Sequence, residues 1–425
     1  MKKILCVLAG ALVLAGIGVV LLWPADDPGA PPTVAAGLTA ADQVARGAYL
    51  AKAGDCMACH TTRGGAAYAG GRALQTPFGS VISPNITSDR ATGIGSWSAD
   101  DFWHALHNGK SRDGRLLYPA FPYTNYTKVT RDDADALYAF FQQVPAQSQA
   151  NRAHELRFPY NQQIMLAAWR ALYFRPSVWR AQGGQTLEWN RGAYLVQGLG
   201  HCSACHSGRN RLGASDGTLS GGLIPILGWY APSLTSDAEA GLGNWEGEHI
   251  EALLKTGVSP RATVFGPMAE VVQQSLQHLG QADVKAMAIY LKSLPDATTE
   301  KPQPAAALSP RAQAQFDNGA KLYQTHCADC HQANGSGIAP AYPPLAGNRA
   351  LTMADAANPI RIVLNGGFAP GTEGNPRPYG MPAYGPLLDD GEVAAVVSYL
   401  RNAWGNTAPP VSANDVNKYR SVPLD

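Results

Sequence analysis

The chain has 425 residues, of which 15% are charged, and a formal net charge of +1. This balance provides no strong basic field to hold phosphates, so nucleic acid is not expected as a partner. Glycine (45) and proline (31) are enriched, which is too little for a disordered chain but fits turn-rich connections among about two to four domains. The seven cysteines are an odd number, so a simple set of disulfides does not account for them.

The N-terminus begins with two lysines, followed by an uncharged stretch at residues 4–23 that contains Cys6. A helix of roughly 20 apolar residues can span a bilayer, and the lysines suit its cytoplasmic end. A cleaved signal peptide is the alternative, although no small-residue cleavage site follows at once. We therefore expect residues 1–23 to be a membrane anchor or signal segment and residues 24–41 to be a stalk. Both alternatives export the rest of the chain.

The other six cysteines form three copies of a Cys-x-x-Cys-His motif, at residues 56–60, 202–206 and 327–331. This is the attachment motif of c-type haem, in which two thiols bond to the porphyrin and the histidine ligates iron. A zinc site would need four ligands, and a disulfide would not explain the histidine. We therefore predict three covalently bound haem c groups. The predicted attachment residues are Cys56, Cys59, Cys202, Cys205, Cys327 and Cys330, and the predicted axial histidines are His60, His206 and His331.

The surroundings of the three motifs repeat as well. A short predicted helix with one glycine, expected to allow close packing (Gly47, Gly192 or Gly319), precedes each motif. A long loop and a second helical pattern follow it. This order is typical of the class I cytochrome c fold. We expect a mainly α chain of three tandem class I cytochrome c-like domains behind the N-terminal anchor or signal segment. The predicted domains are 42–145, 188–295 and 315–404, with a linker at 296–314 and a tail at 405–425.

Residues 146–187 do not belong to the repeats and are predicted to be an amphipathic linker. Its helical pattern has arginines beside an apolar stripe, and the stripe consists of Ile164, Met165, Ala168, Leu172 and Tyr173. Two interpretations stay open. The helix packs between the first and second domains, or it is a docking surface for a partner or for the membrane interface.

Methionine is a common sixth ligand of such irons. Met268 and Met381 lie after the long loop and before the last helix of repeats two and three, and we predict that they are axial ligands. Met287 and Met353 are expected to pack in the core. The first repeat has Phe121 where the third has Met381, and phenylalanine cannot ligate iron.

The sixth ligand of the first haem therefore stays open. His104, His107 or Met165 could ligate, or the iron could be five-coordinate or water-ligated. An open first haem predicts carbon monoxide binding at one reduced haem in three.

Three such repeats behind an apolar N-terminus resemble the cytochrome c subunit of membrane-bound bacterial dehydrogenases for alcohol, gluconate, sorbitol or fructose, and aldehyde. The segments that carry this resemblance are 46–50, 85–87, 93–95, 189–195, 265–268 and 404–406. In this family, the segment that holds Phe121 here often reads Pro-Ala-Met-Pro-Tyr, so the family's ligation of the first haem is not carried over to this chain.

The resemblance implies an electron-transfer subunit that is not an enzyme on its own and has no catalytic residues. It implies a large dehydrogenase partner with pyrroloquinoline quinone, flavin or molybdopterin, with or without a small subunit. It also implies ubiquinone or the respiratory chain as acceptor, and a place at the periplasmic face of the bacterial inner membrane. An alternative is a haem enzyme, peroxidase-like or an oxidase component, that uses an open first haem. A free periplasmic electron carrier is a third class.

Overall fold

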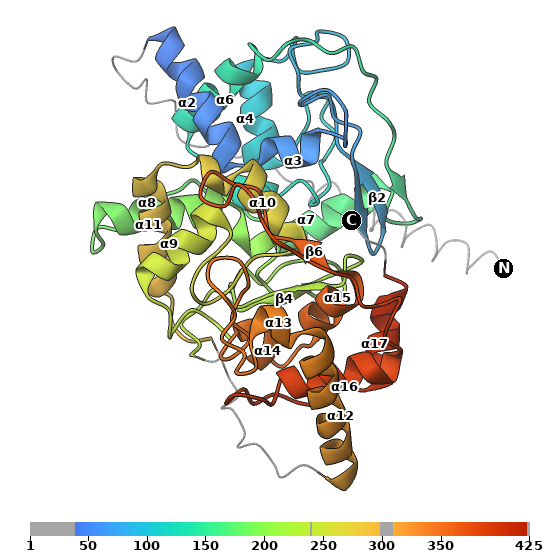
Figure 1. Ribbon diagram of the computed structural model, residues 1–425. Helices are drawn as coiled ribbons and strands as arrows, with labels where there is room; N and C mark the ends of the chain where they lie inside the picture. Colours follow the sequence, from blue (N-terminus) through green and yellow to red (C-terminus); the bar gives the residue numbers. More distant parts are fainter. Residues whose placement is uncertain (1–38, 239, 298–308, 423–425) are drawn as a thin grey trace, which may run out of the picture. The chain divides into compact units, whose positions relative to one another are not determined.

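The computed structural model describes residues 39–238, 240–297 and 309–422 (Figure 1). The predicted anchor or signal segment at 1–23 and nearly all of the predicted stalk lie outside these ranges. Within them, no helix is both long enough and apolar enough to cross a membrane.

The described residues form two units. The first comprises the chain up to Ala181 together with Gln197–His201 and Arg211–Ala214. The second comprises Gln182–Val196, Cys202–Asn210 and the chain from Ser215 onward. The second unit therefore contains most of the second predicted domain and all described residues of the third.

The first unit is mainly helical, with one small sheet. Its elements are α2 (Ala40–Ala53), α3 (Cys56–His60), β1 (Ala73–Thr76), β2 (Gly79–Ile82), α4 (Ala99–Asn108), α5 (Tyr123–Tyr126), α6 (Arg131–Phe141), β3 (Glu155–Leu156) and α7 (Gln163–Tyr173). The sheet is antiparallel in the order β1-β2-β3. Because β3 pairs Leu156 with Gly79 and Glu155 with Ser80, the start of the predicted linker is part of the first unit.

The second unit repeats the same plan twice. The second repeat has α8 (Leu187–Tyr194), the π-helix η1 (Leu195–Leu199, shared with the first unit), η2 (Cys202–Ala204), β4 (Gly222–Ile224), β5 (Trp229–Ala231), α9 (Gly247–Thr256), α10 (Pro267–Gln274), η3 (Leu276–His278) and α11 (Gln281–Lys292). The third has α12 (Pro310–His326), α13 (Ala328–His331), α14 (Arg349–Thr352), α15 (Ala357–Asn365), β6 (Gly367–Phe368), β7 (Gly380–Met381), α16 (Asp390–Leu400) and α17 (Ala413–Arg420). Strands β4 and β5 form one antiparallel pair, and β6 and β7 form another.

In every repeat the first and last helices cross at a glycine: α2 with α6, α8 with α11, and α12 with α16 (Figure 1). A Cβ atom at this position would collide with the backbone of the opposite helix. Its distance to the facing carbonyl oxygen would be 1.9 Å for Gly47 and Ala136, 1.9 Å for Gly192 and Ala286, and 2.1 Å for Gly319 and Ala395. The close-packing role predicted for these glycines is confirmed.

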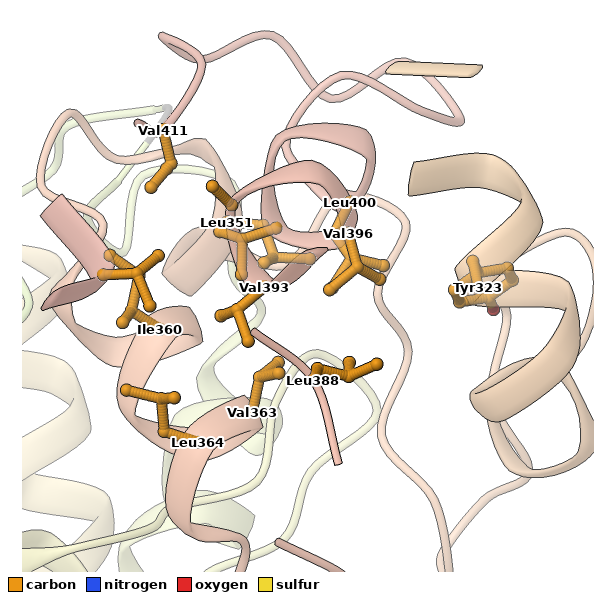
Figure 2. Packing of buried hydrophobic residues seen from close by; sticks show 13 residues of the cluster. Tyr323, Leu351, Ile360, Val363, Leu364, Leu388, Val393, Val396, Leu400 and Val411 are labelled. Atoms are coloured by element: carbon orange, nitrogen blue, oxygen red, sulfur yellow. The ribbon is translucent and has the colours of Figure 1, made fainter. Parts of the chain in front are cut away.

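The core of the third domain is an apolar cluster between α15, α16 and the segments around them (Figure 2). Val411 and Val416 lie beyond the predicted end of this domain, yet they are only 4% and 0% exposed and belong to the cluster. Helix α17 packs on α15 and α16. The predicted tail at 405–425 therefore contributes to the core of the third domain.

Helix α7, in the predicted linker, is amphipathic as expected. It buries Leu166 and Ala167 against Leu116 of the first domain. The predicted apolar stripe lies on the opposite side of the helix, and most of it is exposed: Ile164 is 47% exposed, Met165 44%, Leu172 69% and Tyr173 39%. The apolar stripe is therefore not the side by which α7 packs on the first domain.

Candidate haem-binding sites

Each Cys-x-x-Cys-His motif forms one tight helical turn. The first is helix α3. In the other two, the amide of His206 donates to the carbonyl of Cys202 at 2.9 Å, and the amide of His331 donates to the carbonyl of Cys327 at 3.0 Å. Among the described residues, none of the six motif cysteines forms a disulfide. One turn therefore presents two thiols and the imidazole that follows them, as covalent haem attachment requires.

The three motif histidines share one hydrogen bond that the sequence alone did not predict. In each, Nδ1 lies within hydrogen-bond distance of a proline carbonyl oxygen. The distances are 2.8 Å for His60 and Pro84, 2.7 Å for His206 and Pro232, and 3.1 Å for His331 and Pro343. Because a carbonyl only accepts, the proton lies on Nδ1 and the lone pair on Nε2. This bond orients the ring and leaves Nε2 as the metal-ligating atom.

Burial sets the protonation state of these groups. It lowers the pKa of all three imidazoles. The pKa of His206 falls to about 4, where burial is the largest cause and the nearby Arg349 guanidinium adds to it. Neutral imidazole is the form that binds a metal. Burial also raises the pKa of the Cys56 and Cys202 thiols to about 12, and an uncharged thioether suits these positions. The residues therefore fit the covalent haem that the motif implies.

A second contact at the motifs was also missed. The guanidinium of Arg72 donates to the carbonyl of Ala58, and that of Arg209 donates to the carbonyl of Ala204. Both carbonyls belong to the residue before the second cysteine of the motif. Arg72 is far from its motif in sequence whereas Arg209 is close to it, so no shared spacing could have revealed this role.

In the third domain, the loop with Met381 is tied to the haem motif. Strand β7 pairs Met381 with Gly367, and Met381 packs on the same apolar cluster as Cys327. The hydroxyl of Tyr384 donates to the carbonyl of His326, directly before Cys327, at 2.6 Å. Met381 remains the predicted sixth ligand of this haem.

In the second domain, Met268 is half-buried in the first turn of α10. The turn begins at Gly266, whose φ of +57° and approach to the ring of Trp229 leave no room for a Cβ atom. Met268 remains the predicted ligand of this haem. Met287 and Met353, predicted to pack, are 1% and 4% exposed, which confirms that prediction.

In the first domain, Phe121 lies just before α5 and aligns in sequence with Met381. Its ring lies 5.3 Å from the ring of Tyr126 between centroids. The hydroxyl of Tyr126 donates to the carbonyl of Gly54, two residues before Cys56, at 2.8 Å. In both the first and the third domain, a tyrosine that follows Phe121 or Met381 therefore donates to a carbonyl just before the haem motif.

The other candidates for this sixth ligand are His107, His104 and Met165. His107 is fully buried; its ring stacks on Trp103 at 4.5 Å, and its Nδ1 lies 2.8 Å from the carbonyl oxygen of Thr127. His104 contacts Asn108 through Nδ1 at 2.9 Å. Met165 is 44% exposed on α7. These positions favour packing for His107 and leave the sixth ligand of the first haem open.

A family model described as cytochrome c matches residues 44–145, 190–295 and 316–404. The chain belongs to the cytochrome c family. Since each of the three matched segments contains one attachment motif, this cytochrome carries three covalently bound haem c groups.

Known relatives cover nearly its whole length. It is 41% identical over 400 residues to the gluconate 2-dehydrogenase cytochrome c subunit of Pantoea cypripedii, covering 89% of each chain. It is 38% identical to the cytochrome c subunit of the quinone alcohol dehydrogenase of Gluconobacter oxydans, covering 89% of this chain and 82% of that one. It is 34% identical to the fructose dehydrogenase cytochrome subunit of Gluconobacter japonicus, covering 90% and 84%.

Proposed function

We propose that this triheme cytochrome c is the electron-transfer subunit of a dehydrogenase complex. It accepts electrons from a large catalytic subunit that contains pyrroloquinoline quinone, flavin or molybdopterin, and passes them to ubiquinone or the respiratory chain. The observation that carries this proposal is the same proximal site built three times in one chain, with each histidine held by a proline carbonyl. The similarity to cytochrome subunits of dehydrogenases supports it.

When bound, the haem iron supplies the one-electron chemistry. The chain's own residues hold and tune it. The proline carbonyls fix the orientation and basicity of the three imidazoles. Such sites suit repeated electron transfer, because little rearranges when the charge of the iron changes.

A haem enzyme based on the first site is not favoured. Substrate chemistry at an open iron needs a nearby acid or base, and Phe121 offers neither. The hydroxyl beside it, that of Tyr126, is engaged by the carbonyl of Gly54. Burial raises the pKa of Tyr126 well above its usual value, so this phenol does not exchange protons near neutral pH.

We propose that the cytochrome works at the periplasmic face of the inner membrane. The uncharged stretch at residues 4–23 supports attachment there. The segment around α7 also suits an anionic lipid surface, because Phe158 and Leu172 are 80% and 69% exposed. Residues 156–181 contain three exposed arginines, Arg157, Arg175 and Arg180, and no acidic residue. The protein is labelled with a spin label at Leu172→Cys and mixed with vesicles of anionic lipid. Because oxygen concentrates in the bilayer, this label should be more accessible to oxygen than to a water-soluble relaxant. The same label on Leu187→Cys, 87% exposed in the second unit, is the control, and equal accessibility of the two labels would contradict this placement.

Affinity purification of the tagged cytochrome from native membranes tests the proposed partner. A large dehydrogenase subunit should travel with it in a fixed ratio, and the cofactor of that subunit would define its substrate class. A Cys327→Ser/Cys330→Ser variant, which cannot attach the third haem, should reduce electron flow to quinone. Recovery of the cytochrome without any dehydrogenase would favour a free electron carrier.

A further inference from the structure

Arg349 begins helix α14 of the third domain, yet its side chain reaches the haem site of the second domain. Its Nη1 donates to the carbonyl of Ser233 at 3.1 Å. Ser233 directly follows Pro232, whose carbonyl oxygen lies 2.7 Å from Nδ1 of His206. The guanidinium of one domain therefore contacts the backbone turn that orients the predicted iron ligand of another.

Arg349 is buried, and no carboxylate among the described residues neutralises its positive charge. The residue is 9% exposed, and its guanidinium carbon lies 5.0 Å over the ring of Trp245. No carboxylate among the described residues forms an ion pair with Arg349. Burial lowers the pKa of Arg349 to about 10, so the side chain still carries a full positive charge at neutral pH.

The neighbouring residue makes the matching contact in its own domain. Nδ2 of Asn348 donates to the carbonyl of Pro344 at 2.9 Å. Pro344 follows Pro343, whose carbonyl is the partner of His331. Consecutive side chains at the start of α14 thus support the proximal turns of two haem sites, but only the second site receives a charge.

We infer that Arg349 is a positioning residue that raises the reduction potential of the second haem and makes this potential depend on the third domain. Ferric haem carries one more positive charge than ferrous haem. A buried cation near the proximal ligand destabilises the ferric state more, because charges interact strongly where water is excluded. The inference concerns the haem itself and does not depend on which dehydrogenase is the partner.

Potentiometric titration of the purified holoprotein tests this inference. Arg349→Met should shift the ferrous-to-ferric ratio of the second haem at least tenfold toward ferric, which lowers its midpoint potential by 59 mV or more for a one-electron couple. The component that is missing in a Cys202→Ser/Cys205→Ser variant identifies the second haem. Arg349→Lys keeps the charge and should restore most of the potential.

Arg401→Met is the matched control. Arg401 is also a fully buried arginine of the third domain, and its guanidinium donates to the carbonyls of Pro409 and Ala354 in that domain. It should leave the potential of the second haem unchanged. An unchanged midpoint in Arg349→Met would overturn the inference. An equal shift in Arg401→Met, or the same shift at all three haems, would also overturn it, since each would point to general disturbance of the fold.

Discussion

Gly192 of α8 crosses α11 so closely that a Cβ atom would lie 1.9 Å from the carbonyl oxygen of Ala286. In an ordinary helix, Gly→Ala stabilises by about 1 kcal/mol. Here the two helices must move apart, so Gly192→Ala should lower the free energy of unfolding of the second unit by about 2 kcal/mol. Thermal unfolding of the holoprotein measures this. Gly184→Ala, with no atom within 4 Å of the new Cβ, is the control, and equal stability of the two variants would show that the crossing is not tight.

Phe121 decides whether the first haem is open. If it stands where a methionine would ligate, the reduced protein binds carbon monoxide at one haem in three, and Phe121→Met abolishes this binding. Phe121→Leu, which keeps an apolar side chain without sulfur, should bind carbon monoxide like the native protein. Absorbance titration of the reduced protein measures the stoichiometry. Three inert haems in the native protein would point instead to one of the other candidate ligands, such as His104.

Val416 makes α17 part of the third domain. Its side chain is 0% exposed, so Val416→Ala should destabilise this domain by about 2 kcal/mol, through the loss of buried apolar area and the cavity left behind. Asn414→Ala, on the exposed side of the same helix, should have little effect. Denaturant unfolding followed by haem absorbance compares the two. No difference between them would mean that α17 does not stabilise the domain.

Helix α17 should also loosen at acid pH. A hydrogen bond from Lys418, followed by one from Ser412, lowers the pKa of Asp415 to about 2 from its ordinary value near 3.8. Since the folded pKa is the lower one, the stabilisation is fully present above about pH 4 and is lost as the pH falls toward 2. Amide exchange of α17, corrected for the intrinsic rate, should speed up over this range. Asp415→Asn should remove the pH dependence, and an unaltered dependence in that variant would assign it to another group.

The sequence was sufficient to predict the repeats, because covalent attachment and tight helix crossings restrict residue identity at Cys202, His206 and Gly192. The proline partners of the motif histidines were predictable in part, because Pro84 and Pro232 occupy matching places in repeats one and two. The partner in the third repeat, Pro343, lies closer to its histidine and breaks that alignment.

The orientation of α7 could not be predicted from periodicity. Helical spacing defines two sides of α7, and it left open whether the more apolar side packs between domains or is an exposed docking surface. The structure buries the side with Arg170, whose guanidinium donates to the carbonyl of Asn108 at 2.5 Å and lies 5.0 Å over the ring of Tyr123. A buried arginine depends on partners that are distant in sequence. The contact between Arg349 and Ser233 was unpredictable for the same reason.

The most direct test of the account is whether substrate electrons pass through these haems. Native membranes should be mixed anaerobically with gluconate, ethanol or fructose, the substrate classes named for the relatives, while the haem c absorbance of this cytochrome is followed. We expect one substrate to reduce its haems and an added ubiquinone analogue to reoxidise them, with neither change in membranes that lack the chain. Haems that stay oxidised with all three substrates, in a protein that turns over peroxide by itself, would contradict the account.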